Sequence, residues 1–168
     1  PSAGTGLLAW PAARAGARLA LNEIDRRRRA CLTEAFPHAA ISSHDAELID
    51  DLLSPRLLPD VILMNPPFAR STGRGADARA AERHLAAAAK RLRAGGRLVA
   101  IMPPRFEAAR FAAGAHTPIT LRLNALLAPG LYAKHGTSIA LRLIVFDKDA
   151  DPRPALEFDA SATDSNID

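Results

Sequence analysis

The feature that most constrains the fold is an uninterrupted apolar run, Val61-Ile62-Leu63-Met64, that leads directly into Asn65-Pro66-Pro67-Phe68. Four consecutive apolar residues without alternation are typical of a strand covered on both faces, as at the centre of a parallel sheet. The two prolines cannot continue such a strand, because proline has no backbone N–H. The sequence therefore predicts a central buried strand that stops at a stiff, polar turn.

Short apolar runs alternate with helical patterns along the rest of the chain. The predicted strands cover residues 18–21, 39–43, 61–64, 97–102, 119–123 and 137–146. The predicted helices cover residues 25–35, 47–53, 76–93 and 105–113. The last two strands have no helix between them, so we expect them to be antiparallel neighbours. This order predicts an α/β fold, a mostly parallel doubly wound sheet with a C-terminal antiparallel strand, which binds ligands at the carboxyl ends of its strands.

The charge is unevenly distributed over the 168 residues, a length that suits one domain. Residues 149–168 contain six acidic residues and one basic residue, Arg153, which gives a net charge of −5. Residues 1–148 therefore carry a net charge of +9. We expect a main domain over residues 1–148 and an acidic tail over 149–168, irregular apart from a short strand at 156–158. A basic domain suits a polyanionic partner, although arginines on solvated helix faces explain the charge equally well.

Several classes of protein are disfavoured. No apolar run is long enough to span a bilayer and no signal peptide opens the chain, so we expect a cytoplasmic protein without a membrane partner. The single cysteine, Cys31, excludes an internal disulfide framework and a multi-cysteine zinc site. The five histidines lack the spacing of metal ligands, so no metal is expected.

Polar residues at two predicted strand ends favour a nucleotide. The opening Pro1-Ser2-Ala3-Gly4-Thr5-Gly6 has glycines that let backbone approach a ligand closely. Glu23 follows Gly4 by 19 positions, where nucleotide-binding α/β folds place an acid that accepts from ribose hydroxyls. Ile24 can pack on an adenine face. Asp45 ends the next strand, where it either accepts from an adenine amino group or caps the following helix.

The turn at residues 65–68 resembles that of the amino-group methyltransferases, which methylate adenine N6, cytosine N4, guanine N2 or a glutamine amide. An exocyclic amine is a poor nucleophile because its lone pair is delocalised, so acceptors must draw its protons away. The Asn65 side-chain oxygen and the Pro66 carbonyl can supply two preorganised acceptors. Phe68 can stack on an extruded base.

The order of motifs resembles the class I S-adenosylmethionine-dependent adenine-N6 DNA methyltransferases, especially the methylase modules of strawberry-notch-type methylase/helicase proteins. The motifs are Ser2 to Gly6, Asn22-Glu23-Ile24-Asp25, Asp45, Asn65 to Phe68, Gly95-Gly96 with residues 97–103, and Gly136-Thr137-Ser138 with residues 143–148. The resemblance covers roughly residues 1–148 and implies a Rossmann-like methyltransferase catalytic core. It implies S-adenosylmethionine as cofactor without a metal, nucleic acid (DNA favoured) as substrate, and a helicase domain of the intact protein as a partner.

The resemblance also assigns roles to residues. The catalytic residues it implies are Asn65, Pro66, Pro67 and Phe68. The cofactor-binding residues it implies are Ser2, Ala3, Gly4, Thr5, Gly6, Glu23, Ile24, Asp45, Ala46 and Asn65. Arg70 and Arg74, in a loop of turn formers over residues 69–77 that we expect to be mobile without substrate, are candidates for contacts with phosphates.

One departure concerns the start of the chain. These methylases have a first β-strand, followed by an acidic residue, before the proline that corresponds to Pro1. That strand normally lies between the strands that carry Glu23 and Asn65. We therefore expect a fragment truncated at its N-terminus, a gap in its sheet and the loss of one cofactor contact.

Three alternatives stay open at this point. A glutamine methyltransferase and an rRNA guanine-N2 methyltransferase share the Asn-Pro-Pro-aromatic turn, although the hairpin at residues 136–148 favours the DNA class. A non-catalytic module that binds nucleic acid or a helicase is favoured by the missing strand and disfavoured by the retained Glu23 and Asn65.

Overall fold

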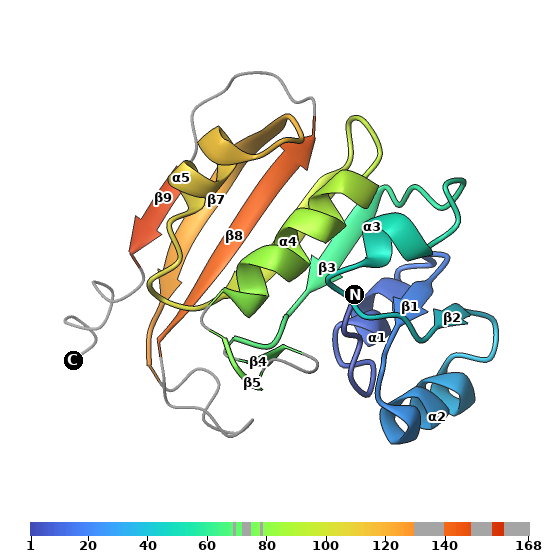
Figure 1. Ribbon diagram of the computed structural model, residues 1–168. Helices are drawn as coiled ribbons and strands as arrows, with labels where there is room; N and C mark the ends of the chain where they lie inside the picture. The colour runs from blue at the N-terminus through green and yellow to red at the C-terminus, as the bar shows by residue number, and fades with distance from the viewer. Residues whose placement is uncertain (69, 72–74, 78, 130–139, 149–155, 160–168) are drawn as a thin grey trace.

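A computed structural model of the chain describes all residues except 69, 72–74, 78, 130–139, 149–155 and 160–168 (Figure 1). The helices are α1 (Ala9–Arg14), α2 (Arg26–Ala35), α3 (Ile49–Leu52), α4 (Ala80–Arg91) and α5 (Ala108–Gly114). The strands are β1 (Ala20–Asn22), β2 (Ala40–Ser42), β3 (Val61–Met64), β4 (Arg70–Ser71), β5 (Gly75–Ala76), β6 (Arg97–Met102), β7 (Ile119–Leu127), β8 (Leu141–Lys148) and β9 (Leu156–Asp159).

The described strands form one large sheet and two small ones. The large sheet has the order β3-β6-β8-β7-β9, and β1 pairs only with β2. Strand pairs β1/β2, β3/β6 and β7/β9 are parallel, whereas β8 runs antiparallel to both β6 and β7. The mixed sheet, with parallel strands followed by a C-terminal antiparallel strand, confirms the predicted Rossmann-like α/β fold.

The main core lies between the large sheet and α4. This helix is rich in alanine. Its buried residues are Ala80, Ala81, His84, Leu85, Ala87, Ala88, Ala89 and Arg91. The small side chains let the helix lie close to the sheet, where Ile62, Met64 and Leu98 are almost fully buried. In Figure 1, α4 and α5 lie on the same face of the large sheet.

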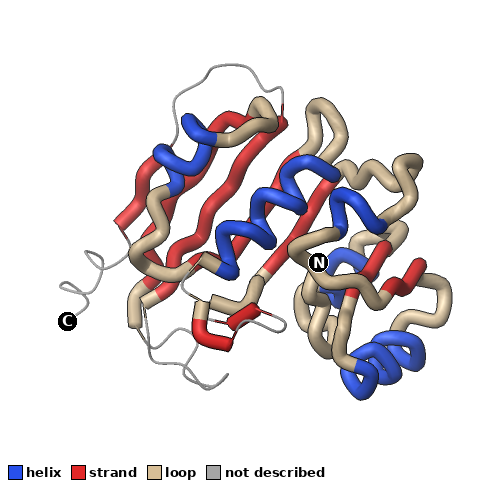
Figure 2. Tube along the Cα trace, viewed as in Figure 1, coloured by secondary structure: helices blue, strands red, loops and turns tan. Residues whose placement is uncertain are grey.

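The two parts of the parallel sheet are separated by a gap. Strands β1 and β3 do not pair with each other, and a hollow of about 790 Å³ lies between them, lined by residues of both strands. Figure 2 shows the β1/β2 pair standing apart from the five-stranded sheet. This is the gap expected between the strands that lead to Glu23 and Asn65.

The gap also explains an error in the sequence interpretation of β3. The strand was expected to be buried on both faces, but only Ile62 and Met64 are buried, whereas Val61 is 55% exposed and Leu63 37% exposed. Val61 and Leu63 line the hollow. Their apolar character fits a strand position whose neighbour on that side is absent from the described residues.

Other predicted elements differ at their ends. The segment 69–77 was expected to lack regular structure, yet β4 and β5 form a short antiparallel pair there. Two residues on each side are too few to give a periodic pattern. Strand β9 of the tail pairs with β7, so the sheet extends past residue 148. The predicted strand start at residues 137–139 and the mobility expected at 69, 72–74 lie outside the described residues.

A second, smaller core holds the part that contains β1. It consists of Ala9, Leu21, Leu32 and Phe36, and the ring of Trp10 lies 4.9 Å from that of Phe36. Gly6 packs directly against this core. A Cβ at Gly6 would lie 2.4 Å from Cε2 of Phe36, and the backbone there has φ +94°. Glycine is therefore required at this position for packing as well as for conformation.

We expect Gly6→Ala to lower the free energy of unfolding by about 2–4 kcal/mol, because strain at positive φ and overpacking add together. Fluorescence of Trp10, the single tryptophan, can follow urea unfolding of this core. Gly4→Ala is the matched control, since Gly4 has φ +61° but nothing within 4 Å of the added Cβ. A loss in Gly6→Ala no larger than in Gly4→Ala would contradict the packing requirement.

Candidate active site

The glycine turn is attached to the end of β1. Ser2 and Gly4 adopt left-handed backbone conformations, with φ 52° and 61°. The Ala3 N–H donates to the Asn22 carbonyl at 2.8 Å, and the Gly4 N–H donates to the Glu23 carboxylate at 2.7 Å. Two segments 19 residues apart in the sequence are therefore held together, as the spacing of Gly4 and Glu23 predicts.

Glu23 is a buried carboxylate, 4% exposed. One oxygen accepts from the Gly4 N–H and the other from the Asp25 N–H at 2.9 Å. A carboxylate offers about four lone-pair positions, so two backbone donors leave room for further donors such as hydroxyls. Ile24 beside it is 48% exposed, although it is a large apolar residue. An exposed apolar surface next to a buried acceptor suits a nucleoside.

The segment after β2 is tied to β1 by Asn22. The buried Asn22 side chain accepts from the His44 N–H and the Ser42 hydroxyl, each at 2.9 Å, and donates to the His44 carbonyl at 2.9 Å. Asp45 follows, and its carboxylate accepts from the Glu47 N–H at 3.0 Å. Asp45 thus closes a turn before α3, with Ala46 buried behind it.

The turn after β3 brings Asn65 to the same edge of the structure. Asn65 is exposed, and its side chain makes no hydrogen bond to any residue that the structure describes. Pro66 is buried, Pro67 is exposed, and Phe68 is half-buried against the main core. Asn65 lines the rim of the hollow together with Ser2 and Asn22. The structure therefore brings the predicted turn and the predicted nucleotide residues together across the gap.

The family of the chain follows from its sequence as well as its fold. Residues 2–112, which include all of these site residues, match the methyltransferase small domain family. The chain belongs to this family. It is therefore a domain of the S-adenosylmethionine-dependent methyltransferases.

Solved structures with low sequence identity share the fold of this methyltransferase domain. They include a type I restriction-modification methyltransferase subunit from Streptococcus thermophilus (17% identity, TM-score 0.75, 99% of this chain and 42% of that chain). A protein described as a type I modification subunit from Vibrio vulnificus YJ016 has 18% identity and a TM-score of 0.73, over 99% of this chain and 43% of that chain. TrmN from Thermus thermophilus has 21% identity and a TM-score of 0.59, over 86% and 41%.

The chain thus spans less than half the length of these three proteins. At such identities the likeness shows the fold. No curated protein sequence matches the chain significantly.

The residues of the methyltransferase domain fit an adenosyl group. Backbone at Gly4 faces open space, since a Cβ there would meet nothing within 4 Å. Glu23 is preorganised by two backbone donors, and Ile24 offers an apolar surface beside it. Gly6, in contrast, packs against Phe36. Glycine is therefore needed at this position for packing and not for close approach of a ligand.

A polar network on α4 was not predicted from the sequence. The Arg83 guanidinium donates to both carboxylate oxygens of Glu47, at 2.8 and 3.2 Å, and also pairs with Asp77. His84 Nε2 lies 3.8 Å from Glu47 Oε1, and its Nδ1 lies 3.4 Å from the Ser2 hydroxyl. The only signal in the sequence is a pair of adjacent polar residues beside Leu85 in a helix that is otherwise apolar on one side.

Burial controls the charge of His84. Its side chain is 7% exposed, and this desolvation lowers the pKa of His84 below its ordinary value. Glu47 and Asp45 act in the opposite direction, whereas Arg83 and the N-terminal amino group add to the lowering. His84 is therefore neutral near pH 7, and its ring lies between the Ser2 hydroxyl of the glycine turn and the Glu47 carboxylate of the turn after β2.

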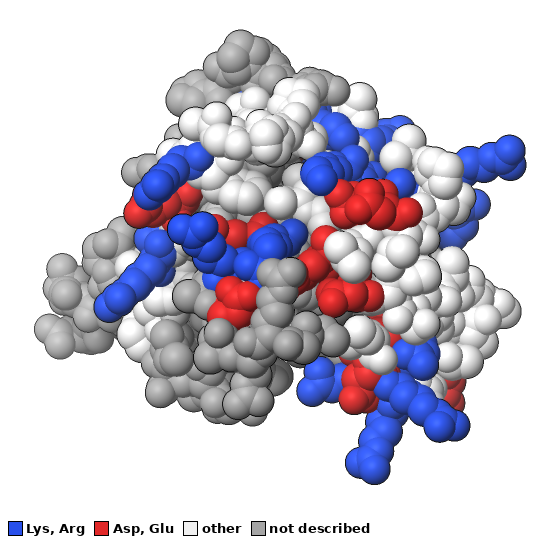
Figure 3. All heavy atoms as spheres, in the orientation of Figure 1, with Lys and Arg blue, Asp and Glu red and all other residues white. Residues whose placement is uncertain are grey.

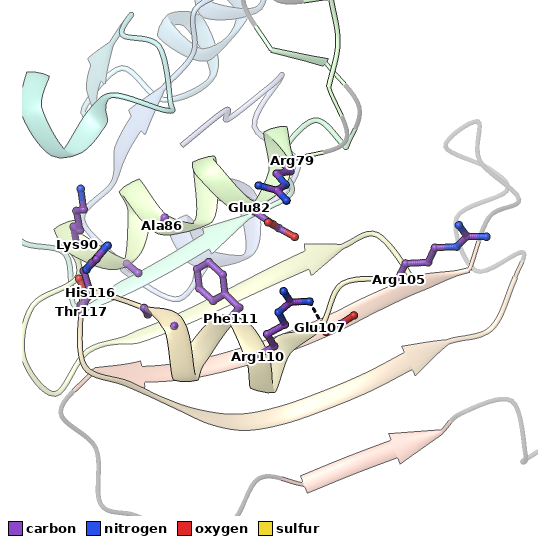
Figure 4. Close-up of a pocket in the computed structure, with 13 residues that line it drawn as sticks. Arg79, Glu82, Ala86, Lys90, Arg105, Glu107, Arg110, Phe111, His116 and Thr117 are labelled. Atoms are coloured by element: carbon purple, nitrogen blue, oxygen red, sulfur yellow. Dashed lines mark ion pairs between the residues drawn. The ribbon is translucent and has the colours of Figure 1, made fainter.

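A second hollow, of about 390 Å³, lies between α4 and α5 (Figure 4). Its lining includes Arg79, Glu82, Lys90, Arg110 and Phe111, and Arg110 pairs with Glu107 at 3.6 Å. None of the site residues predicted from the sequence belongs to this lining. It is distinct from the site at the strand ends.

Two absences concern the described residues alone. No group of three or more His, Cys, Asp or Glu side chains there is arranged to hold a metal ion. No helix in that part of the chain is long and apolar enough to cross a membrane.

Proposed function

We propose that this domain transfers a methyl group from S-adenosylmethionine to the exocyclic N6 amino group of adenine in DNA. The observation that carries the proposal is that Asn65, which begins the turn after β3, lines the same hollow as Ala3 and Asn22, the residues directly before Gly4 and Glu23. The Asn65 turn suits an amine, and the segments joined by the Gly4–Glu23 contact suit an adenosyl group.

The chemistry assigned to the turn is acceptance of hydrogen bonds from the amine. Asn65 has an unengaged side-chain oxygen among the described residues, and the buried Pro66 fixes the backbone carbonyl beside it. These acceptors draw the amine protons out of the plane of the base, so that the nitrogen lone pair is no longer delocalised into the ring and faces the donor. Bound S-adenosylmethionine would supply the methyl group, with the N–C bond formed as its S–C bond breaks and the surplus amine proton released to solvent.

No covalent enzyme intermediate is part of the proposal. The sequence has one cysteine, Cys31, which lies on α2 rather than at the turn. Phe68 is proposed to stack on the base with the part of its ring that the core leaves exposed.

DNA is proposed as the nucleic acid because residues 1–148 carry a net charge of +9 and because two structural neighbours are described as type I modification subunits. Arg70 and Arg74 remain proposed phosphate contacts, and their side chains lie outside the described part of the chain. Figure 3 shows mixed acidic and basic side chains over α4. A basic run lies instead at the start of α2, where Arg26, Arg27 and Arg28 are exposed.

A helicase domain of a longer, strawberry-notch-type protein is the proposed partner, and the cytoplasm is the proposed location. The partner rests on the motif order alone, and the location rests on the single cysteine and the lack of a long apolar run in the sequence. A second candidate function is a non-catalytic module that binds nucleic acid or a helicase, which the net charge of +9 over residues 1–148 also suits. The methylation of guanine N2 or of a glutamine amide would use the same turn.

A labelled-methyl assay tests the proposed function. Duplex DNA, single-stranded DNA, RNA and a glutamine-bearing peptide are offered side by side to the chain and to a version extended at Pro1 by an apolar β-strand that can fill the hollow. Label at adenine N6 of DNA is expected. Label only in RNA, only in the peptide or in cytosine would move the target to another amino group. Binding of cofactor without any label would favour the non-catalytic module.

A further inference from the structure

The turn that joins β1 to α2, residues 23–25, is held by one residue of the helix. Arg29 Nη1 donates to the carbonyl of Glu23 at 2.9 Å and to the carbonyl of Ile24 at 3.1 Å. The backbone N–H of Arg29 donates to the next carbonyl, that of Asp25, at 2.9 Å. Three consecutive carbonyls of the turn therefore accept from the same residue.

The bond to the Ile24 carbonyl determines where the neighbouring N–H points. The Ile24 carbonyl and the Asp25 N–H belong to one planar trans peptide unit, in which the two groups point in opposite directions. The Asp25 N–H donates to Oε1 of Glu23 at 2.9 Å. A rotation of the unit that breaks the bond to Arg29 would also misdirect this donor. Arg29 thus fixes one of the two backbone donors that hold the Glu23 carboxylate.

Arg29 differs from the three arginines that precede it in the sequence. Arg26, Arg27 and Arg28 are exposed, and their side chains make no hydrogen bond to any residue that the structure describes. Arg29 is half-buried, and its guanidinium is spent on the turn. Hydrogen bonds from a charged donor are shorter and stronger than those between neutral groups. Of these four arginines, Arg29 is therefore the one that is built into the turn.

We propose that Arg29 is a positioning residue that orients the Glu23 carboxylate for the ribose hydroxyls of the cofactor. The inference rests on the proposed function and adds to it a residue that no motif in the sequence indicated. The Gly4 and Asp25 donors occupy part of the acceptor capacity of Glu23, so they set the directions from which hydroxyls can still donate. A carboxylate that is ordered before the ligand arrives lowers the cost of binding.

The test compares two probes that differ at the ribose, S-adenosylhomocysteine and its analogue without the two ribose hydroxyls. Arg29→Met keeps an apolar side-chain stem and removes the donors. Calorimetry is expected to show that this change weakens binding of S-adenosylhomocysteine by about tenfold, within the usual range of coupling between groups in contact. Binding of the analogue is expected to change by less than about twofold, because it makes no ribose contact with Glu23. A merely structural role would weaken both probes by the same factor.

Arg27→Met is the matched control, because it removes the same charge from an exposed position of the same helix. The affinity for both probes should stay unchanged in this variant. Fluorescence of Trp10 checks the fold of each variant, since its ring lies 4.9 Å from that of Phe36, the C-cap of α2. Arg29→Lys is a second variant in case Arg29→Met does not fold. It keeps a charged donor on a shorter side chain, so we expect the same contrast between the probes with a loss of about threefold.

Two results would overturn the inference and leave the proposed function untouched. Equal weakening of both probes in a folded Arg29 variant would show that the residue does not act through the ribose contact. A loss in Arg27→Met as large as in Arg29→Met would assign the effect to the charge of α2 and not to the bonded carbonyls. Failure of the unmodified chain to bind S-adenosylhomocysteine is the distinct third result, which would overturn the proposed function and this inference with it.

Discussion

Asn65→Ala is expected to lower the rate of methyl transfer by about a hundredfold or more. The side-chain oxygen is the proposed acceptor for an amine proton, and loss of one preorganised polar partner of a transition state has an effect of this size. The fold should survive, because Asn65 is exposed and its side chain bonds to none of the described residues. Single-turnover transfer of labelled methyl, with both substrates saturating, measures the effect.

Phe68→Leu provides the comparison for this variant. Leucine keeps the packing of residue 68 on the main core but removes the aromatic face. We expect binding of the target to weaken by about 1–3 kcal/mol, the usual contribution of one stacked base, with a smaller change in the transfer rate. A loss in Asn65→Ala that is confined to cofactor affinity, with an unchanged transfer rate, would disprove the catalytic role of Asn65.

Glu23→Gln is expected to weaken binding of S-adenosylmethionine by roughly ten- to a hundredfold, the equivalent of about 1.5–3 kcal/mol for hydrogen bonds to a charged group. The amide has one acceptor oxygen where the carboxylate has two, and both oxygens of Glu23 already hold backbone N–H groups. The variant therefore loses acceptor capacity for ribose hydroxyls, and one of the two backbone N–H groups loses its acceptor because the amide NH2 can only donate. Glu23→Ala would also leave the Gly4 and Asp25 N–H groups without this partner, so its effect would mix binding with stability.

Asp25→Asn is the matched control for Glu23→Gln. Asp25 is the N-cap of α2 and accepts from the Arg28 N–H at 2.9 Å, a contact that lowers the pKa of Asp25. Asparagine caps helices about as well, so the fold is preserved while a neighbouring negative charge is removed. Calorimetry should give an unchanged affinity for Asp25→Asn. An equal loss in both variants would indicate a general charge effect instead of ribose binding.

Parts of the fold were predictable because local sequence and tertiary context agree. Strands β3 and β6 have the predicted bounds, since each apolar run ends at prolines that prevent further pairing. Helix α2 follows the prediction to within one residue, since Asp25, expected as its first residue, is its N-cap. The antiparallel pairing of β7 with β8 followed from the absence of a helical pattern between them.

Other features depend on contacts that no local pattern encodes. Val61 and Leu63 are as apolar as their neighbours, and only the topology places them beside a hollow. The spacing of Gly4 and Glu23 predicted their proximity, but the packing of Gly6 on Phe36 depends on the position of α2. The ion pairs of Arg83 join residues 6 and 36 positions away, so they could not be read from helix periodicity.

The gap between β1 and β3 has a consequence for cooperativity. The chain contains two apolar clusters, one around Phe36 and the other around α4 and the large sheet, with no strand pairing between the two sheets. The smaller cluster should melt at a lower temperature, so the signal of Trp10 and the circular dichroism of the whole chain should give non-coincident transitions. The proposed cofactor-binding residues include Glu23 after β1 and Asn65 after β3, so an adenosyl group bound as proposed would span the gap. The ligand would then couple the unfolding of the two clusters, so that the two thermal transitions merge into one.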